Sequence, residues 1–165
     1  MIGLAAALAL AVQQPPATGL DGPYDSNGVF ARILRGTIPV AKVCEDQRTL
    51  VFIPKDWRSP GEILVIPKRH VRNLLGLQPR ELERLMVAVQ HAAVAQRRAL
   101  HSTGFQVVQN NGATSEQTVF HVHFHVVPSF GRVPTSADFR PDVPMAEMQA
   151  MGARLKRAWP TRGRC

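Results

Sequence analysis

Short runs of apolar, β-branched residues alternate with polar turns in the first half of the chain. Residues 40–44 and 49–53 are two such runs, and the polar residues 45–48 separate them. This spacing is typical of a β-hairpin. Residues 63–66 form another apolar run that ends at Pro67, which favours a further buried strand.

Apolar residues recur every three to four positions in residues 79–101, which we predict to form the main helix. Pro79 suits the first helical turn, and the basic residues Arg97 and Arg98 suit the last turn. An apolar stripe along this helix would consist of Leu82, Leu85, Met86, Val89, Ala93 and Leu100.

The rest of the pattern predicts shorter elements. We expect helices at residues 29–35 and 146–158, and strands at residues 105–109 and 118–127, the last one ended by Pro128. The order of helix, hairpin, strand, long helix and two strands predicts an α+β fold with a mainly antiparallel sheet.

These elements divide the chain into three parts. Residues 28–130 would form one domain, and residues 131–165 a C-terminal arm with a short helix. Residues 1–27 are predicted to be a signal peptide and linker, because residues 2–12 are an uncharged apolar run too short to span a bilayer. We therefore expect export to the periplasm or the cell exterior. A mis-assigned start codon or a loosely packed helix would also explain the run, with the protein then in the cytoplasm.

Charge and cysteine content narrow the functional classes. The formal net charge of +8 favours an anionic partner such as a nucleotide or phosphate. The basic residues form no stripe interleaved with aromatic residues, so nucleic-acid binding is not expected. A membrane span is not expected either, because the apolar run at residues 2–12 is too short. Cys44 and Cys165 form no Cys-x-x-Cys motif of the zinc-knuckle or thioredoxin type. We expect Cys44 to be a core residue and not a nucleophile.

Three histidines at alternate positions are the main chemical signal. In a strand, His121, His123 and His125 would project from one face, while the apolar residues between them would pack on the core. His-x-His is a zinc-ligand spacing, so one interpretation is a metal-dependent hydrolase using His121, His123 and Glu62. The other is nucleophilic attack on phosphorus by an imidazole. The polar loop at residues 110–118 favours the second, because it offers donors for phosphoryl oxygens.

The motif His121-Val-His-Phe-His125, followed by two apolar residues, resembles the signature of the histidine-triad (HIT) family. The loop that contains Asn110 and Gly112 is most similar to the histidine-triad nucleotide-binding branch, whose members include phosphoramidases. The likeness spans residues 29–128 and implies a HIT-like fold. Its other matching segments are residues 30–39, 64–70, 105–112 and 117–119.

The resemblance implies a role for each matching residue. His123 would attack the α-phosphorus and form a nucleotidyl-histidine that water hydrolyses, with His125 at the phosphate or leaving group and His121 supporting the rings. It further implies a nucleotide or nucleoside-phosphate conjugate as partner, no metal or other cofactor, and a homodimer joined through the long helix. Residues implied to bind the nucleotide or its phosphate are Asn110, Gly112, Gln117 and Thr118.

Two positions depart from the family pattern. Glu62 stands where relatives usually have a fourth histidine, and Pro54 stands where they have an acidic residue that contacts ribose. We expect Glu62 to enter the substrate site beside the triad and to favour the protonated form of His123. The departures also leave open a third function, a nucleotide-binding module with little turnover.

Overall fold

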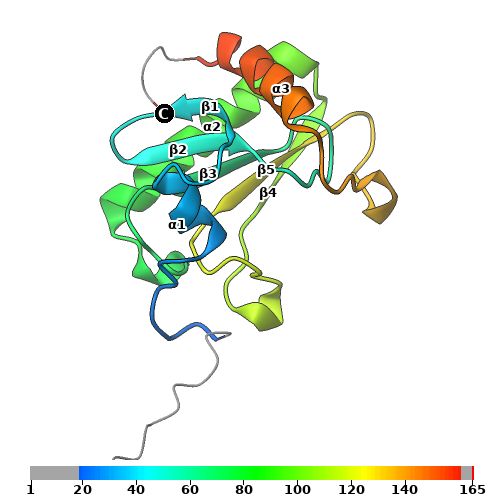
Figure 1. Ribbon diagram of the computed structural model, residues 1–165. Coiled ribbons are helices and arrows are strands. Elements are labelled where there is room, and N and C mark those ends of the chain that lie inside the picture. The colour runs from blue at the N-terminus through cyan, green and yellow to red at the C-terminus, as the bar shows by residue number, and fades with distance from the viewer. Residues whose placement is uncertain (1–18, 161–164) are drawn as a thin grey trace, which may run out of the picture.

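The computed structural model describes residues 19–160 and residue 165. Its five strands form one antiparallel sheet in the order β1-β2-β3-β5-β4 (Figure 1). The fold is therefore α+β with an antiparallel sheet, which confirms the predicted class. The strands are β1 Ala41–Glu45, β2 Thr49–Ile53, β3 Ile63–Pro67, β4 Gly104–Val108 and β5 Phe124–Ser129.

Helices cover both faces of the sheet. Helix α1 (Val29–Leu34) lies in front of the sheet in Figure 1, and α2 (Pro79–Leu100) crosses behind it. Helix α3 (Met145–Arg157) packs beside α2 and against β1 and β2. Three short 3₁₀ helices complete the described chain: Leu74–Gly76, Ala113–Ser115 and Ser136–Asp138. None of the described helices is long and apolar enough to cross a membrane.

Strand alternation sorts the buried side chains into two clusters. In β2, Val51 and Ile53 belong to the large cluster under α2 and α3, while Leu50 and Phe52 belong to the smaller one under α1. Strand β3 divides in the same way, because successive side chains of a strand point to opposite faces. The face that carries α1 is the one that bears the candidate site.

The hairpin at residues 41–53 confirms its prediction. Its turn is closed by Asp46, whose Oδ1 accepts hydrogen bonds from the backbone N–H groups of Arg48 and Thr49, both at 2.8 Å. A short polar residue that binds nearby backbone in this way is the reason the chain reverses here.

Helix α2 follows its predicted bounds but buries a different stripe. Gln78 and Glu81 form a capping box around Pro79 at the first turn, and His101 ends the helix in the left-handed conformation with φ 59°. Leu85, Val89 and Ala93 are buried as predicted, whereas Leu82 and Met86 remain 37% and 42% exposed. Two residues of the predicted apolar stripe therefore lie on the surface of this chain and not in its core. The buried face instead includes Ala88, Ala92, Ala95 and Gln96.

The last strand differs from the prediction at both ends. It begins at Phe124 and not at residue 118, since pairing with β3 and β4 starts only at Phe124 and His125. It continues through Pro128 to Ser129. Strand β3 pairs with β5 only at residues 124–126, so Pro128 lies where β5 has one neighbouring strand. A proline is tolerated at such an edge position because no ladder hydrogen bond needs its missing N–H.

The C-terminal arm is fastened to the sheet. Leu155 of α3 is fully buried in the main core, and Cys165 forms a disulfide with Cys44 of β1 across 5.7 Å between Cα atoms. Cys44 packs against the main core as expected, but sequence analysis did not predict its pairing.

Candidate active site

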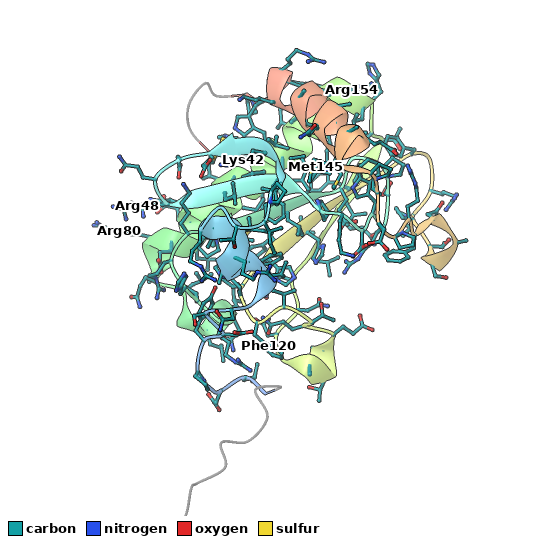
Figure 2. The ribbon with its side chains drawn as sticks, viewed as in Figure 1. Lys42, Arg48, Arg80, Phe120, Met145 and Arg154 are labelled. Carbon is teal, nitrogen blue, oxygen red and sulfur yellow. A yellow bond between two sulfur atoms is a disulfide. The ribbon has the colours of Figure 1, made fainter. Side chains whose placement is uncertain are left out.

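A cavity of about 910 Å³ opens on the α1 face of the sheet. Its walls are mostly apolar, from Phe30 and Ile33 of α1, Phe52 of β2 and Leu64 of β3. Met145 and Met148, in the first turn of α3, close one side of the cavity. Figure 2 labels Met145. The polar and charged side chains that line the cavity are Lys55, Asp56, Arg58, Glu116, Thr118, His123, His125 and Asp142.

The histidines keep the predicted alternation although two of them precede β5. The side chains of Val122, Phe124 and Val126 pack in the large cluster under α2 and α3. His123 and His125 line the cavity with ring centroids 5.0 Å apart, and His121 is buried behind them. The extended backbone at residues 121–123 alternates as a strand does, held by the hydrogen bond from the Val122 N–H to the Val71 carbonyl, 2.8 Å.

His123 has the arrangement that a nucleophilic imidazole requires. Its Nδ1–H donates to the backbone carbonyl of His121 at 2.7 Å, which leaves the lone pair on Nε2. Burial lowers the pKa of His123 from its ordinary value of 6.5 to about 4. The ring is therefore neutral at pH 7, which is the state in which Nε2 can attack.

Both ring nitrogens of His121 form hydrogen bonds. Its Nε2–H donates to the Pro67 carbonyl at 2.9 Å, and its Nδ1 accepts from the Tyr24 hydroxyl at 2.7 Å. Burial lowers the pKa of His121 to about 4 as well. Tyr24 also stacks on His70, with 4.5 Å between ring centroids. Tyr24 lies in the segment predicted as linker, and no sequence signal linked it to the triad.

Glu62 contacts a different histidine from the one expected. Its Oε1 accepts a 2.6 Å hydrogen bond from Nδ1 of His125, and the carboxylate is buried with 1% of the residue exposed. The expectation that Glu62 enters the substrate site and acts on His123 is wrong, because Glu62 does not line the cavity and its carboxylate is bonded to His125. Glu62 therefore lies beneath the cavity wall, behind His125.

The polar loop contributes one of its four predicted residues to the cavity. Thr118 lines it, whereas Asn110, Gly112 and Gln117 do not. Gln117 is buried and binds backbone only: its Oε1 accepts from the Gly112 N–H, and its Nε2 donates to the Arg72 and Val119 carbonyls. Both polar atoms of the amide are bonded to backbone, so Gln117 holds the loop in shape.

Sequence analysis missed two basic residues of the cavity. Arg58 lines it, and its charge is one of the causes that lower the pKa of His123, so a guanidinium lies near His123. Lys55 lies at the same cavity and pairs with Asp142 of the C-terminal arm at 2.7 Å. Neither stands in a motif, which explains why the sequence alone did not indicate them.

Pro54 forms part of the apolar wall. It is buried, and its carbonyl accepts a hydrogen bond from the Trp57 indole at 2.8 Å. The neighbouring Asp56 also lines the cavity, where its Oδ1 accepts from the Asp142 N–H at 3.0 Å.

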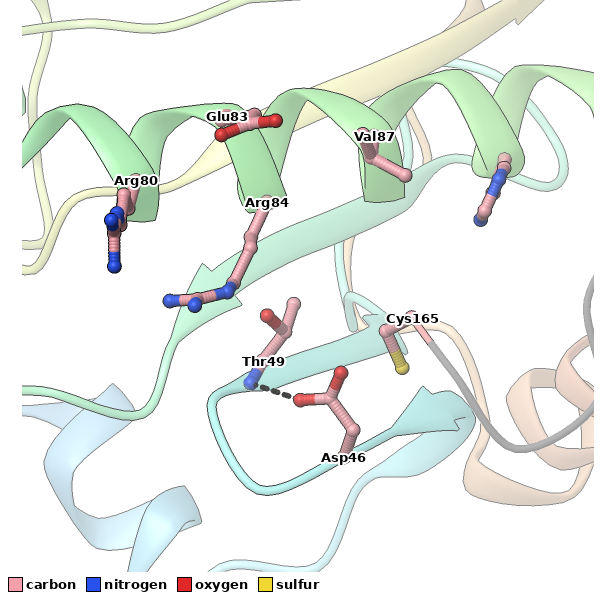
Figure 3. A pocket seen from close by; sticks show the side chains of 8 residues that line it. Asp46, Thr49, Arg80, Glu83, Arg84, Val87 and Cys165 are labelled. Carbon is pink, nitrogen blue, oxygen red and sulfur yellow. Dashed lines mark hydrogen bonds between the residues drawn. The ribbon is translucent and has the colours of Figure 1, made fainter.

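Other features of the described chain lie apart from the triad. A second cavity of about 620 Å³ lies between α2 and the β1–β2 turn, where Figure 3 shows Arg80, Glu83 and Arg84 above Asp46 and Thr49. The basic side chains of Arg48 and Arg80 lie at the edge of the molecule, on the β1–β2 turn and on α2 (Figure 2). Within residues 19–160 and at Cys165, no group of three or more His, Cys, Asp or Glu side chains is placed to hold a metal ion.

Known proteins are similar to this chain in sequence and in fold. The HIT domain matches residues 35–132. The chain is 36% identical over 106 residues to Protein hit of Bacillus subtilis, covering 64% of this chain and 73% of that protein. It is 33% identical over 100 residues to adenosine 5'-monophosphoramidase hnt1 of Schizosaccharomyces pombe, covering 61% and 72%. The crystal structure of a Hit-like protein from Bartonella henselae superposes with a TM-score of 0.75 at 34% identity, covering 82% and 98%.

Proposed function

The chain belongs to the HIT domain family, and we propose that it is a nucleotide hydrolase or transferase acting at an α-phosphorus through His123. The observation that carries the proposal is the state of His123: a neutral ring at the cavity wall with its Nδ1–H fixed on a carbonyl. An imidazole held in this way directs one lone pair at a substrate.

In the proposed reaction, Nε2 of His123 forms a bond to the α-phosphorus and the leaving group departs. Water then attacks the nucleotidyl-histidine and restores the ring. Thr118 and the guanidinium of Arg58 line the same cavity and would donate to phosphoryl oxygens. Preorganised donors of this kind are each worth about 3 kcal/mol of transition-state stabilisation.

Nucleoside phosphoramidates are the substrate class that we favour. One relative, at 33% identity, is an adenosine 5'-monophosphoramidase. The apolar residues Phe30, Ile33 and Leu64 suit the flat face of a base, and Arg58 and Thr118 line the same cavity as His123.

A metal-dependent hydrolase is the second candidate, and the hydrogen bonds argue against it. Both ring nitrogens of His121 already have partners, and Nδ1 of His123 has one. A metal bound by His121 would have to displace one of that ring's hydrogen bonds, whereas in His123 Nε2 alone is open to a metal.

An activity screen tests the proposal and the metal alternative together. We expect cleavage of adenosine or guanosine phosphoramidates in preference to dinucleoside polyphosphates and simple phosphate esters, with full activity retained in excess EDTA. Loss of activity on chelation that zinc restores would favour the metal-dependent hydrolase. Nucleotide binding without turnover of any member would favour the binding module.

We also propose a homodimer joined through α2 and β4. Leu82 and Met86 lie one turn apart on α2, and Phe105 and Val107 alternate on the edge strand β4; all four are between 37% and 53% exposed. Val107 is directly opposite Val126, whose side chain is on the α2 side of the sheet, so the β4 side chains face the same way. An exposed apolar patch next to an unpaired strand edge is typical of an interface.

Sedimentation equilibrium of matched variants tests the interface. Met86→Glu should convert the dimer into a monomer, since it places a charge in the patch. Val87→Glu should leave the dimer intact, because Val87 has similar exposure, 43%, but lines the second cavity. A wild-type monomer, or equal effects of both substitutions, would contradict the interface.

We further propose that the protein is exported. The Cys44–Cys165 disulfide supports this, because disulfides persist in oxidising compartments and are rare in the cytosol. The apolar run at residues 2–12, which has the character of a signal peptide, lies outside the described residues.

A further inference from the structure

Glu62 is a buried carboxylate that contacts only one histidine of the triad. Its two oxygens have separate partners: Oε1 accepts from Nδ1 of His125, and Oε2 accepts from the backbone N–H of Arg58, each at 2.6 Å. The side chain of His125 is 18% exposed and lines the cavity, whereas Glu62 is sealed behind it. A substrate in the cavity would therefore meet His125 and not the carboxylate.

The loop before β3 fixes the carboxylate in place. The Glu62 N–H donates to the Ser59 carbonyl at 3.0 Å. The preceding carbonyl, of Gly61, accepts from Nε2 of the fully buried Gln96, and the same nitrogen donates to the Val126 carbonyl in β5. Gln96 thus ties the loop of Glu62 to the strand that carries His125. These bonds anchor the segments that carry both members of the pair.

The hydrogen bond determines which nitrogen of His125 can exchange a proton with substrate. A carboxylate accepts hydrogen bonds, so Nδ1 of His125 carries a proton and Nε2 is left for the cavity. The negative charge also stabilises the positive charge that the ring acquires when Nε2 is protonated as well. His123 has the opposite environment: its Nδ1–H donates to a neutral carbonyl, and burial keeps its ring neutral. The Nδ1–H of one imidazole thus faces a carboxylate and that of the other a neutral carbonyl, and this difference in partner suits the two rings to different roles.

We propose that Glu62 is a positioning residue that makes His125 the proton donor to the leaving group, so that the site cleaves conjugates with poor, basic leaving groups such as alkylamines and alcohols. This inference rests on the proposed function. It assigns to Glu62 the control of leaving-group range, a role distinct from binding the nucleotide.

The proton balance of both half-reactions is closed by this pair. In the first, Nε2 of His123 bonds to phosphorus, the P–N or P–O bond breaks, and its electron pair goes to the leaving atom. That atom takes the proton from Nε2 of His125. In the second, water gives a proton to Nε2 of His125 while its oxygen bonds to phosphorus. The bond from phosphorus to His123 then breaks, and its electron pair returns to Nε2.

The test is a series of nucleoside 5'-phosphate conjugates that differ only in the leaving group, from p-nitrophenol, which departs unprotonated, to an alkanol and an alkylamine. The measured quantity is kcat/KM, because it includes the steps through leaving-group departure and excludes hydrolysis of the adduct. For Glu62→Gln we expect kcat/KM to fall about 10²-fold or more on the amine and alkanol. On the p-nitrophenyl ester it should stay within about threefold. Glu83 is an exposed carboxylate on α2, so Glu83→Gln is the matched control and should leave kcat/KM unchanged for the whole series.

Each outcome separates this proposal from the one on which it rests. If Glu62→Gln lowers kcat/KM equally for every leaving group, or for none, Glu62 does not act through proton transfer and the inference is overturned. His123→Ala should lose the whole series, including the p-nitrophenyl ester, which would support the nucleophile independently of Glu62. Failure of the wild type to cleave any member would overturn both proposals. Melting temperatures of all variants show whether a uniform loss reflects misfolding.

Discussion

His123→Ala should lower turnover by about 10³-fold or more while leaving nucleotide affinity within about tenfold, or roughly 1.4 kcal/mol. The substitution removes the only ring nitrogen that both lines the cavity and has its partner nitrogen fixed on a neutral carbonyl, within the described chain. The apolar walls that would hold the base come from α1, β2 and β3, so they survive the change. Steady-state kinetics and nucleotide titration of the same preparations measure the two effects.

A chemical trap makes the same prediction specific. An α-labelled substrate should leave acid-labile, base-stable label on the wild type and none on His123→Ala, since phosphorus bonded to imidazole has that stability. His101→Asn is the matched control, because His101 is exposed at the end of α2 and asparagine tolerates its left-handed conformation. Full activity in His123→Ala would refute the assignment of the nucleophile.

Loss of the Cys44–Cys165 disulfide should lower the free energy of unfolding by about 2–5 kcal/mol. The bond closes a loop across a sequence separation of 121, and a cross-link of that span strongly restricts the unfolded chain. For a domain of this size the melting temperature should fall by roughly 5 to 20 °C. Thermal unfolding of the oxidised protein, the reduced protein and Cys165→Ser measures the effect.

The three samples control one another. Reduced wild type and Cys165→Ser should melt at the same temperature, and reductant should not change Cys165→Ser. Protein recovered from its native source should carry the bond and should be found outside the cytoplasm, which tests the proposed export. Two free thiols per chain in that material would contradict both the Cys44–Cys165 disulfide and the proposed export to an oxidising compartment.

The sequence by itself determined the local elements and the family. Hydrophobic period, caps and turn residues act over a few positions each. They determine the hairpin at residues 41–53, the helix at residues 79–100 and the order of the elements along the chain. The side on which the triad projects also follows from alternation, which holds through residues 121–126 even where the strand ladder has not begun. The triad motif then indicated the HIT family, and the match over residues 35–132 confirmed it.

Only the tertiary structure decided the partners of these groups. Glu62 pairs with His125, Tyr24 with His121, and Cys44 with Cys165, although 63, 97 and 121 positions separate the members of each pair. The start of β5 at Phe124 and the exposure of Met86 depend likewise on which segments pack alongside. Local pattern determines which face a side chain occupies. Contacts between distant segments are determined by how helices, strands and loops close on one another, because that closure alone brings those segments within bonding distance.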